Sequence, residues 1–209
     1  MKKILTFLIL LISISALSQE KSEQKVRESF ENYRQAILND KGEEAIKYIS
    51  DNTFDYYHNI LNEVKLADST RIEDLSLIDK LTVLIIRHRT PSDKIKSFDK
   101  KTLVVYALDE GMIGKETVKN YSIGSIYFED ENTALGQLIV NAKSVSANFR
   151  FFKEDNNWKI DITSVMPGTN DAFEKMIESS GMNENEFIFL ILENLTSVKP
   201  EPSIWKPII

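Results

Sequence analysis

Apolar and polar residues alternate along the stretch from Asn120 to Val165, and this alternation predicts an antiparallel sheet. Phe149 and Phe151 are apolar whereas Arg150 between them is polar, a period of two that is typical of a strand with one buried face. Short polar runs that favour hairpin turns separate successive segments of this kind. The stretch therefore predicts a meander of four strands, at residues 121–128, 134–142, 145–151 and 158–163.

Before this stretch, apolar residues recur every three or four positions, which is typical of amphipathic helices. The first helix is predicted from Ser22 to Asn39, and Lys41-Gly42 follows it as a break. Pro91 is expected to end a later helix, because proline cannot continue one. Together these patterns predict helices at residues 22–39, 43–49, 54–66, 77–88 and from 98 to near 111. For residues 77–88 a strand is the alternative, because Thr82-Val83 and Ile85-Ile86 are β-branched pairs that also suit a strand.

The residues after the sheet predict two more helices. Gly181 stands where the first of them needs a left-handed residue to end. Asn183 and Glu186 predict a capping box for the second, at residues 184–195. This second helix is apolar on more than one side, so we expect it to be deeply packed or shared with a partner. Trp205 is expected to hold the extended tail against the body of the protein.

The first residues have the layout of a secretory signal peptide. The chain starts with two lysines after Met1, residues 4–14 are nearly all apolar, and small residues stand at Ala16 and Ser18. We expect cleavage between Ser18 and Gln19, which would give an exported protein, periplasmic or extracellular. The apolar run is shorter than the roughly 20 residues of a membrane span, so no stable span is expected after cleavage. Anchoring to the inner membrane through residues 4–14 is the alternative.

The composition narrows the classes of function. The 209 residues carry a formal net charge of −6 and contain no cysteine. Because nucleic-acid binding needs a basic surface, no nucleic-acid partner is expected. Without cysteine the chain has neither a disulfide framework nor thiol chemistry, so its stability must come from a hydrophobic core.

The candidates for acid–base catalysis are His58, His88 and Asp161. His58 stands on a predicted helix beside an aromatic residue, where a surface role is the usual one. His88 lies close to a predicted helix end, where a cationic side chain interacts favourably with the helix dipole without any ligand. Asp161 and Arg150 alternate with the apolar set, so both are expected on the exposed face of the sheet, where they could pair across strands. We therefore predict no catalytic set.

No metal or cofactor site is predicted either. The two histidines are thirty residues apart and lack the neighbouring ligands of a zinc site. The acidic run at residues 129–131 lacks the alternating oxygen ligands and the central glycine of a calcium loop. The chain contains no phosphate-binding glycine motif and no nucleophile elbow, so a nucleotide cofactor is not expected.

The order of elements resembles the nuclear transport factor 2-like superfamily over about residues 23–165. The residues that carry the likeness are Phe30, Tyr33, Ala45, Ile46 and Ile49 in the helices, and Phe149, Phe151 and residues 157–161 (Asn-Trp-Lys-Ile-Asp) in the sheet. Many members have glycine where Asn157 stands, and asparagine still suits a turn. The resemblance implies an α+β fold in which N-terminal helices pack on a strongly curved, cone-shaped antiparallel sheet. Extra central and C-terminal helices are added to it.

The predicted organisation is therefore a signal peptide at 1–18, the domain at 19–166 with a helical insertion near 67–118, and a helical extension with a tail at 167–209. The family includes isomerases, dehydratases, ligand-binding modules, adaptors and immunity proteins, so the fold does not select a function. A ligand in the cone is expected to contact aromatic residues: Tyr57, Tyr121, Tyr127, Phe149, Phe151 and Trp158.

The hypothesis we favour is an exported, non-enzymatic domain that binds a small apolar ligand or a protein partner. Two alternatives stay open. One is a cone-pocket enzyme, similar to isomerases or dehydratases, that uses a Tyr together with a His or an Asp. The other is an interaction module that forms a homodimer or acts like an immunity protein.

Overall fold

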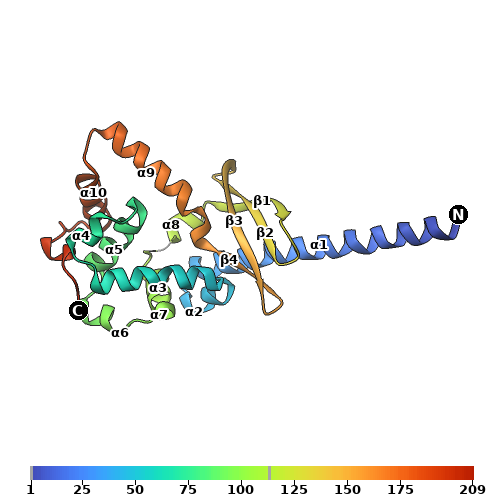
Figure 1. The fold of residues 1–209 in the computed structure, drawn as a ribbon, viewed down its shortest axis with the longest axis horizontal. Helices are drawn as coiled ribbons and strands as arrows, with labels where there is room; N and C mark the ends of the chain where they lie inside the picture. The colour runs from blue at the N-terminus through green and yellow to red at the C-terminus, as the bar shows by residue number, and fades with distance from the viewer. Residues whose placement is uncertain (1, 113) are drawn as a thin grey trace.

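The computed structural model describes residues 2–112 and 114–209, with the side chains of residues 2–18, 116 and 117 left out of the description. The side chains of the predicted signal peptide, residues 1–18, therefore lie outside the described part. The fold is α+β, as the sequence predicts: helices pack on a curved antiparallel sheet of four strands (Figure 1).

The predicted elements occur in the predicted order, and the structure adds the short helices α4, α6 and α8. The helices are α1 (Lys2–Leu38), α2 (Gly42–Ala45), α3 (Asp51–Leu66), α4 (Ser69–Glu73), α5 (Leu77–Arg89), α6 (Ser92–Ser97), α7 (Lys100–Asp109), α8 (Lys115–Val118), α9 (Met166–Ser180) and α10 (Glu184–Thr196). The strands are β1 (Tyr121–Phe128), β2 (Thr133–Val140), β3 (Lys143–Glu154) and β4 (Asn157–Asp161). Short 3-10 helices are η1 (Ile46–Tyr48), η2 (Ile162–Val165) and η3 (Pro202–Trp205).

The sheet is a meander in the order β1-β2-β3-β4, and every neighbouring pair is antiparallel. The register aligns Phe128, Ala134, Phe151 and Ile160 side by side across the four strands. Irregularities interrupt the pairing of β1 with β2 and of β2 with β3. Such interruptions bend strands, so they account for the curvature.

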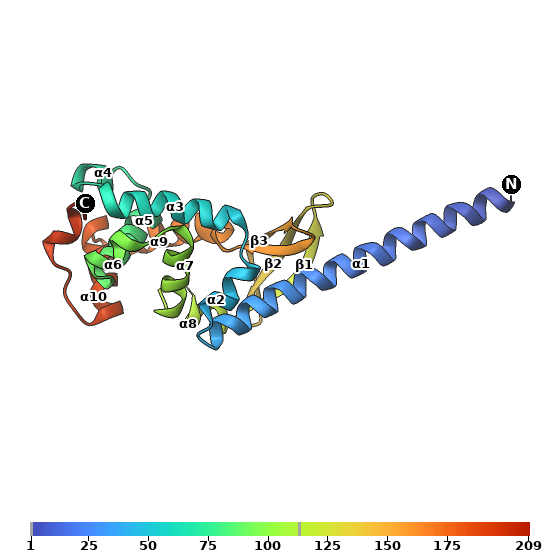
Figure 2. The same cartoon turned by 90° about the horizontal axis from the view of Figure 1, so that it is seen from below.

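The α1 helix covers the inner face of this sheet. Phe30 is buried and its ring centre lies 5.9 Å from that of Phe149. Ser29 Oγ donates a hydrogen bond of 2.7 Å to the backbone oxygen of Trp158, which fixes the helix against β4. The N-terminal part of α1 projects well beyond the sheet (Figures 1 and 2). The apolar face of α1 that the spacing of three or four residues predicts is therefore the face that packs on the sheet.

The remaining helices gather at the end of the molecule opposite the N-terminus (Figures 1 and 2). The start of α3 is tied to the sheet, because Ser50 N donates to the backbone oxygen of Ile160 at 2.9 Å. The buried side chains of α1, α3, α5 and α10 belong to the same apolar core as those of the strands. The central helices therefore share the core of the predicted domain.

Candidate functional site

Most of the aromatic residues predicted to contact a ligand are part of the core. Tyr57, Phe149, Phe151 and Trp158 are buried, and Tyr121 is half-buried. Ring centres lie 6.1 Å apart for Tyr121 and Phe149, a spacing typical of packed aromatic pairs. The structure thus brings these rings together as packing groups, and their contact with a ligand stays a prediction.

Tyr127 is separated from the other aromatic candidates. Its neighbours along β1 face the core, whereas its own side chain is 67% exposed. A period of two places successive side chains on opposite faces of a sheet, so Tyr127 points to the outer face.

The histidines lie on different helices with different partners. His58 is exposed on α3, and its Nε2 lies 3.4 Å from Asn62 Nδ2. His88 is half-buried at the end of α5, with Nε2 2.9 Å from Thr196 Oγ1. Among the described contacts, neither imidazole meets a tyrosine or a carboxylate. The structure therefore assembles no acid–base pair around either histidine.

The predicted exposure of Asp161 is wrong, since its side chain is buried. Its Oδ1 accepts hydrogen bonds from Thr53 Oγ1 at 3.0 Å and from Thr163 N at 2.9 Å. The expected pairing with Arg150 does not form, and Arg150 contacts Glu129 at 3.1 Å instead. The physical reason is that α3 begins over the end of β4, where Thr53 covers the carboxylate.

A tyrosine–aspartate pair that sequence reasoning missed joins α3 and α5. Tyr56 Oη donates to Asp79 Oδ1 at 2.5 Å, and Ser76 Oγ donates to Asp79 Oδ2 at 2.8 Å. Burial and then the bond to Asp79 raise the pKa of Tyr56, so the phenol stays protonated. Because its proton is directed at Asp79, it is not available to a ligand. The pair holds two helices together.

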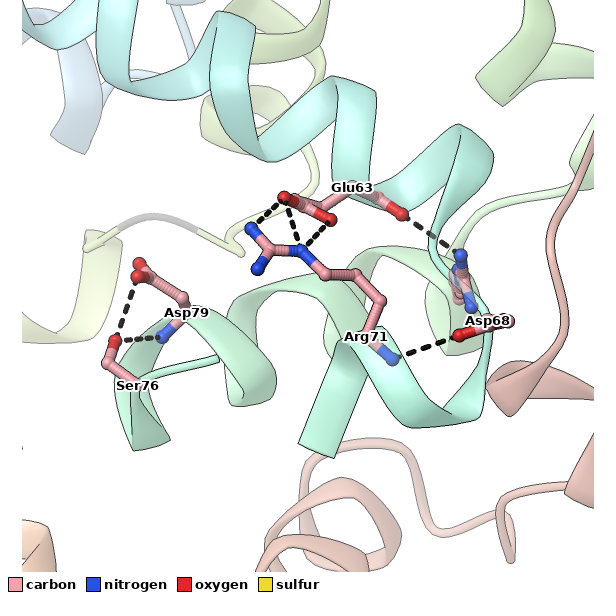
Figure 3. Close-up of polar contacts among 6 residues, drawn as sticks. Glu63, Asp68, Arg71, Ser76 and Asp79 are labelled. Carbon is pink, nitrogen blue, oxygen red and sulfur yellow. Dashed lines mark hydrogen bonds and ion pairs between the residues drawn. The ribbon is translucent and has the colours of Figure 1, made fainter. Parts of the chain in front are cut away.

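The α3–α4–α5 corner has the same structural character (Figure 3). Arg71 Nε donates to both carboxylate oxygens of Glu63, and Asp68 and Ser76 cap the starts of α4 and α5. Each of these side chains has a partner inside the chain. These contacts connect the three helices, so the side chains already have a structural role.

Helix α10 presents the most distinctive surface of the protein. Its start has the predicted capping box between Asn183 and Glu186. One face of the helix is in the core through Phe187, Ile188 and Leu192. The opposite face is not covered by any element of the described chain. As predicted, α10 is apolar on more than one side. The apolar side chains of its uncovered face therefore lie at the surface.

Polar contacts with α5 fix α10 and the tail in place. Lys80, which is buried on α5, forms an ion pair with Glu184 at 2.6 Å. The contact of His88 with Thr196 secures the other end of α10, and Arg87 Nη1 donates to the backbone oxygen of Ile204 at 2.9 Å. The C-terminal extension is therefore part of the folded body.

The exposed face of α10 forms a shallow groove of about 430 Å³, which we call the α10 surface. It is lined by Met182, Glu186, Phe189, Leu190, Glu193 and Lys199. Phe189 stacks on Trp205 with ring centres 6.2 Å apart and planes 11° apart, which confirms that Trp205 holds the tail. The tail thus supports the floor of the groove from behind.

Exposed apolar side chains concentrate in this part of the chain. Among the residues whose side chains are described, six of the eight large exposed hydrophobic residues lie between positions 176 and 209: Met176, Met182, Leu190, Leu195, Val198 and Ile209. Single exposed apolar residues are ordinary, whereas a concentration of them marks an interaction site.

Another hollow, of about 570 Å³, lies where α1 ends beside α2 and α7. Several of its charged groups already have partners in the chain: Asp40 pairs with Lys115, and Glu44 pairs with Lys47. Asp109 accepts a hydrogen bond from Gly42 N at 2.9 Å. These groups would have to give up existing partners to bind a ligand.

No protein-family model matches this chain, and no curated protein or solved structure is significantly similar to it. Among the residues whose side chains are described, His, Asp and Glu nowhere form a group of three or more that could hold a metal ion. In that same part of the chain, which leaves out residues 2–18, no helix combines the length and the apolar character needed to cross a membrane.

The link between α4 and α5, in which Glu73 of α4 pairs with Lys80 of α5 at 2.7 Å, is expected to depend on pH. Hydrogen bonding to Lys80 lowers the pKa of Glu73 below its ordinary value of 4.5. The stabilisation from this ion pair is therefore fully present above pH 4.5 and is lost as the pH falls through the lowered pKa. Burial lowers the pKa of Lys80, but bonds to Glu184 and Glu73 more than offset it. The melting temperature of the wild type relative to Lys80→Met should therefore fall between pH 6 and pH 3.5. We expect about 2–4 °C, the effect of roughly 1 kcal/mol. A gap that stays constant with pH would refute this ion pairing.

Proposed function

We propose that this chain is an exported, non-enzymatic protein-interaction domain that acts through the α10 surface. The observation that carries this proposal is that exposed Met182 and Leu190, together with Phe189, give the groove on α10 an apolar surface. The helix is held firmly by α5, so the surface is preorganised, which lowers the entropic cost of binding. The packed sheet face and the absence of an acid–base pair around His58 and His88 favour binding over catalysis.

We propose a second copy of the chain as the partner. The groove has an apolar centre, Phe189 and Leu190, and a rim that carries both signs of charge: Glu186 and Glu193 against Lys199. A two-fold axis brings the same patch of both copies together. Because the patch carries both positive and negative groups, each copy can pair its charges with opposite charges of the other. Lys199 of one copy can then lie against a glutamate of the other.

Export and membership of the nuclear transport factor 2-like superfamily belong to the same proposal. The charged start and apolar run at residues 4–14 support export. The packing of α1 across a curved antiparallel meander supports the family. Phe149, Phe151 and Trp158, which would line the cone of such a fold, are buried, and this supports an interaction on the outside of the molecule.

Leu190→Glu is expected to convert the dimer to a monomer. Leu190 is 42% exposed, so glutamate is tolerated in the isolated chain, whereas in a dimer it would place an unpaired charge in the apolar centre. We expect the dimer dissociation constant to rise at least about 100-fold, the effect of roughly 3 kcal/mol. Sedimentation equilibrium on the exported protein purified from its host measures this directly.

Leu66→Glu is the matched control, because Leu66 is a leucine that is 60% exposed on α3, outside the α10 surface. It should leave the dissociation constant unchanged. A wild-type protein that sediments as a monomer at about 100 μM would refute the homodimer, because a specific dimer should be formed at that concentration. Equal dissociation of both variants would refute the assignment of the interface to α10.

A further inference from the structure

A separate hollow of about 460 Å³ lies on the outer face of the sheet, beside η2 and the start of α9. We call it the Arg150 hollow; its lining includes Leu135, Asn148, Arg150, Asp161, Ser164 and Val165. The register pairs Leu135 with Arg150 and Arg150 with Asp161, so these three residues form a row across β2, β3 and β4. An apolar, a cationic and an anionic side chain therefore stand in line along one wall.

The carboxylate of Asp161 is only half used by the chain. Its Oδ1 accepts three hydrogen bonds, from Thr53 Oγ1, Thr163 N and Thr163 Oγ1. Its Oδ2 has no hydrogen-bond partner within the described chain, although the residue is only 8% exposed. A cationic donor that reaches this oxygen would therefore find an anionic acceptor that no donor of the described chain occupies.

The guanidinium of Arg150 also keeps donors free. Its Nη2 contacts Glu129 at 3.1 Å, while Nε and Nη1 have no partner among the described residues. Arg150 forms no ion pair with Asp161, although the two are register partners. Ser164 Oγ accepts from Arg150 N at 3.0 Å and donates to the backbone oxygen of Asp161 at 2.5 Å, which fixes the backbone of this wall.

We propose that the Arg150 hollow binds a small zwitterion: a free amino acid or a dipeptide with an apolar side chain. The ammonium group lies against Asp161 Oδ2, the carboxylate accepts from Arg150, and the apolar side chain rests on Leu135 and Val165. Arg150, Glu129 and Asp161 together carry one net negative charge, so a ligand with only a carboxylate is disfavoured. The volume is within the range of about 300–1,000 Å³ that is usual for small-molecule sites.

The probes are leucine, which has both charges, 3-methylbutylamine, which lacks the carboxylate, and 4-methylpentanoate, which lacks the ammonium. Isothermal titration of the full exported protein should show leucine binding at least about 10-fold more tightly than either analogue, because each analogue leaves one charged group without a partner. The site shares no residue with the α10 surface, so failure here leaves the proposed dimer unaffected. Failure of the dimer likewise leaves this site unaffected.

Arg150→Gln is the decisive variant. It should weaken leucine binding at least about 10-fold without weakening the binding of 3-methylbutylamine, because only leucine has a carboxylate for Arg150 and the loss of a positive charge does not disfavour an ammonium group. Arg150 is 43% exposed and its one ion pair is at the surface, so the variant should fold normally. Lys153→Gln removes an exposed positive charge from the same strand and should change neither affinity.

Two results would overturn the proposal. The first is the absence of heat, and of any shift in the Arg150 Nε–H resonance, with leucine at about 10 mM, a concentration that would saturate even a millimolar site. The second is that Arg150→Gln weakens the binding of leucine and of 3-methylbutylamine equally, which would mean that Arg150 does not bind the carboxylate.

Discussion

Phe151→Ala is expected to lower the free energy of unfolding by about 3–5 kcal/mol. Phe151 is fully buried, and the register places it between Ala134 on β2 and Ile160 on β4. A Cβ built on Gly136 would lie only 2.9 Å from the Phe151 ring, so the neighbouring backbone closes directly on it. The cavity left by alanine could not collapse fully, because three strands form its walls. Urea unfolding followed by circular dichroism measures the loss.

Phe152→Ala is the matched control for this prediction. Phe152 is the next residue on β3, points to the opposite face and is half-buried. Its loss should cost about half as much or less, because less apolar surface is buried there. Equal losses for both variants would contradict the core role of Phe151. If Phe151→Ala lowered the free energy of unfolding by less than about 1 kcal/mol, Phe151 would instead line an open cavity that is accessible to a ligand.

The sheet could be predicted from the sequence because its signal is local. Alternation with a period of two needs only neighbouring residues, and it located β1 at residues 121–128, where the structure has it. The longer helices on either side of the sheet could be predicted from apolar residues that recur every three or four positions, and from capping residues such as Asn183 with Glu186. The short helices α4, α6 and α8 were missed, since segments of four to six residues contain too few turns to show a period.

The groups that could bind a ligand depend on contacts between distant segments, which no local pattern contains. Alternation showed that Asp161 points away from the core face, but it could not show that Thr53 of α3 would cover it. Tyr56 and Asp79 are joined by the packing of α3 on α5. For α10, the pattern showed more apolar residues than one face needs, and only the tertiary packing decides which of them, such as Leu190, remain exposed.

Arg87→Met is expected to cost at least about 3 kcal/mol and to release the C-terminal tail. The buried guanidinium donates to backbone oxygens at the end of α3 and in the tail: Glu63 at 3.0 Å, Val64 at 2.9 Å, Ala67 at 2.7 Å and Ile204 at 2.9 Å. Burial lowers its pKa to about 10, so it is still charged at neutral pH. Methionine fills similar space but leaves these oxygens without this donor.

Arg87→Lys should recover only part of the loss, because a single ammonium cannot reproduce the fork of five donors. Arg89→Met is the control on the same helix: Arg89 donates one bond to the backbone oxygen of Glu110, so its loss should stay below about 1 kcal/mol. Hydrogen exchange of the amides at residues 199–209 should speed up in Arg87→Met and not in Arg89→Met. Similar protection in both would show that Arg87 does not anchor the tail.

The same variant connects the core to the proposed interface. Trp205 lies directly after Ile204, whose backbone oxygen Arg87 holds, and its ring stacks on Phe189 at the floor of the α10 surface. Release of the tail should therefore loosen Phe189 and weaken the dimer, although Arg87 is outside the groove. If Arg87→Met frees the tail and the dimer dissociation constant stays the same, the α10 surface does not need Trp205 behind it. In that case α10 would hold Leu190 in position for the interface without support from the tail.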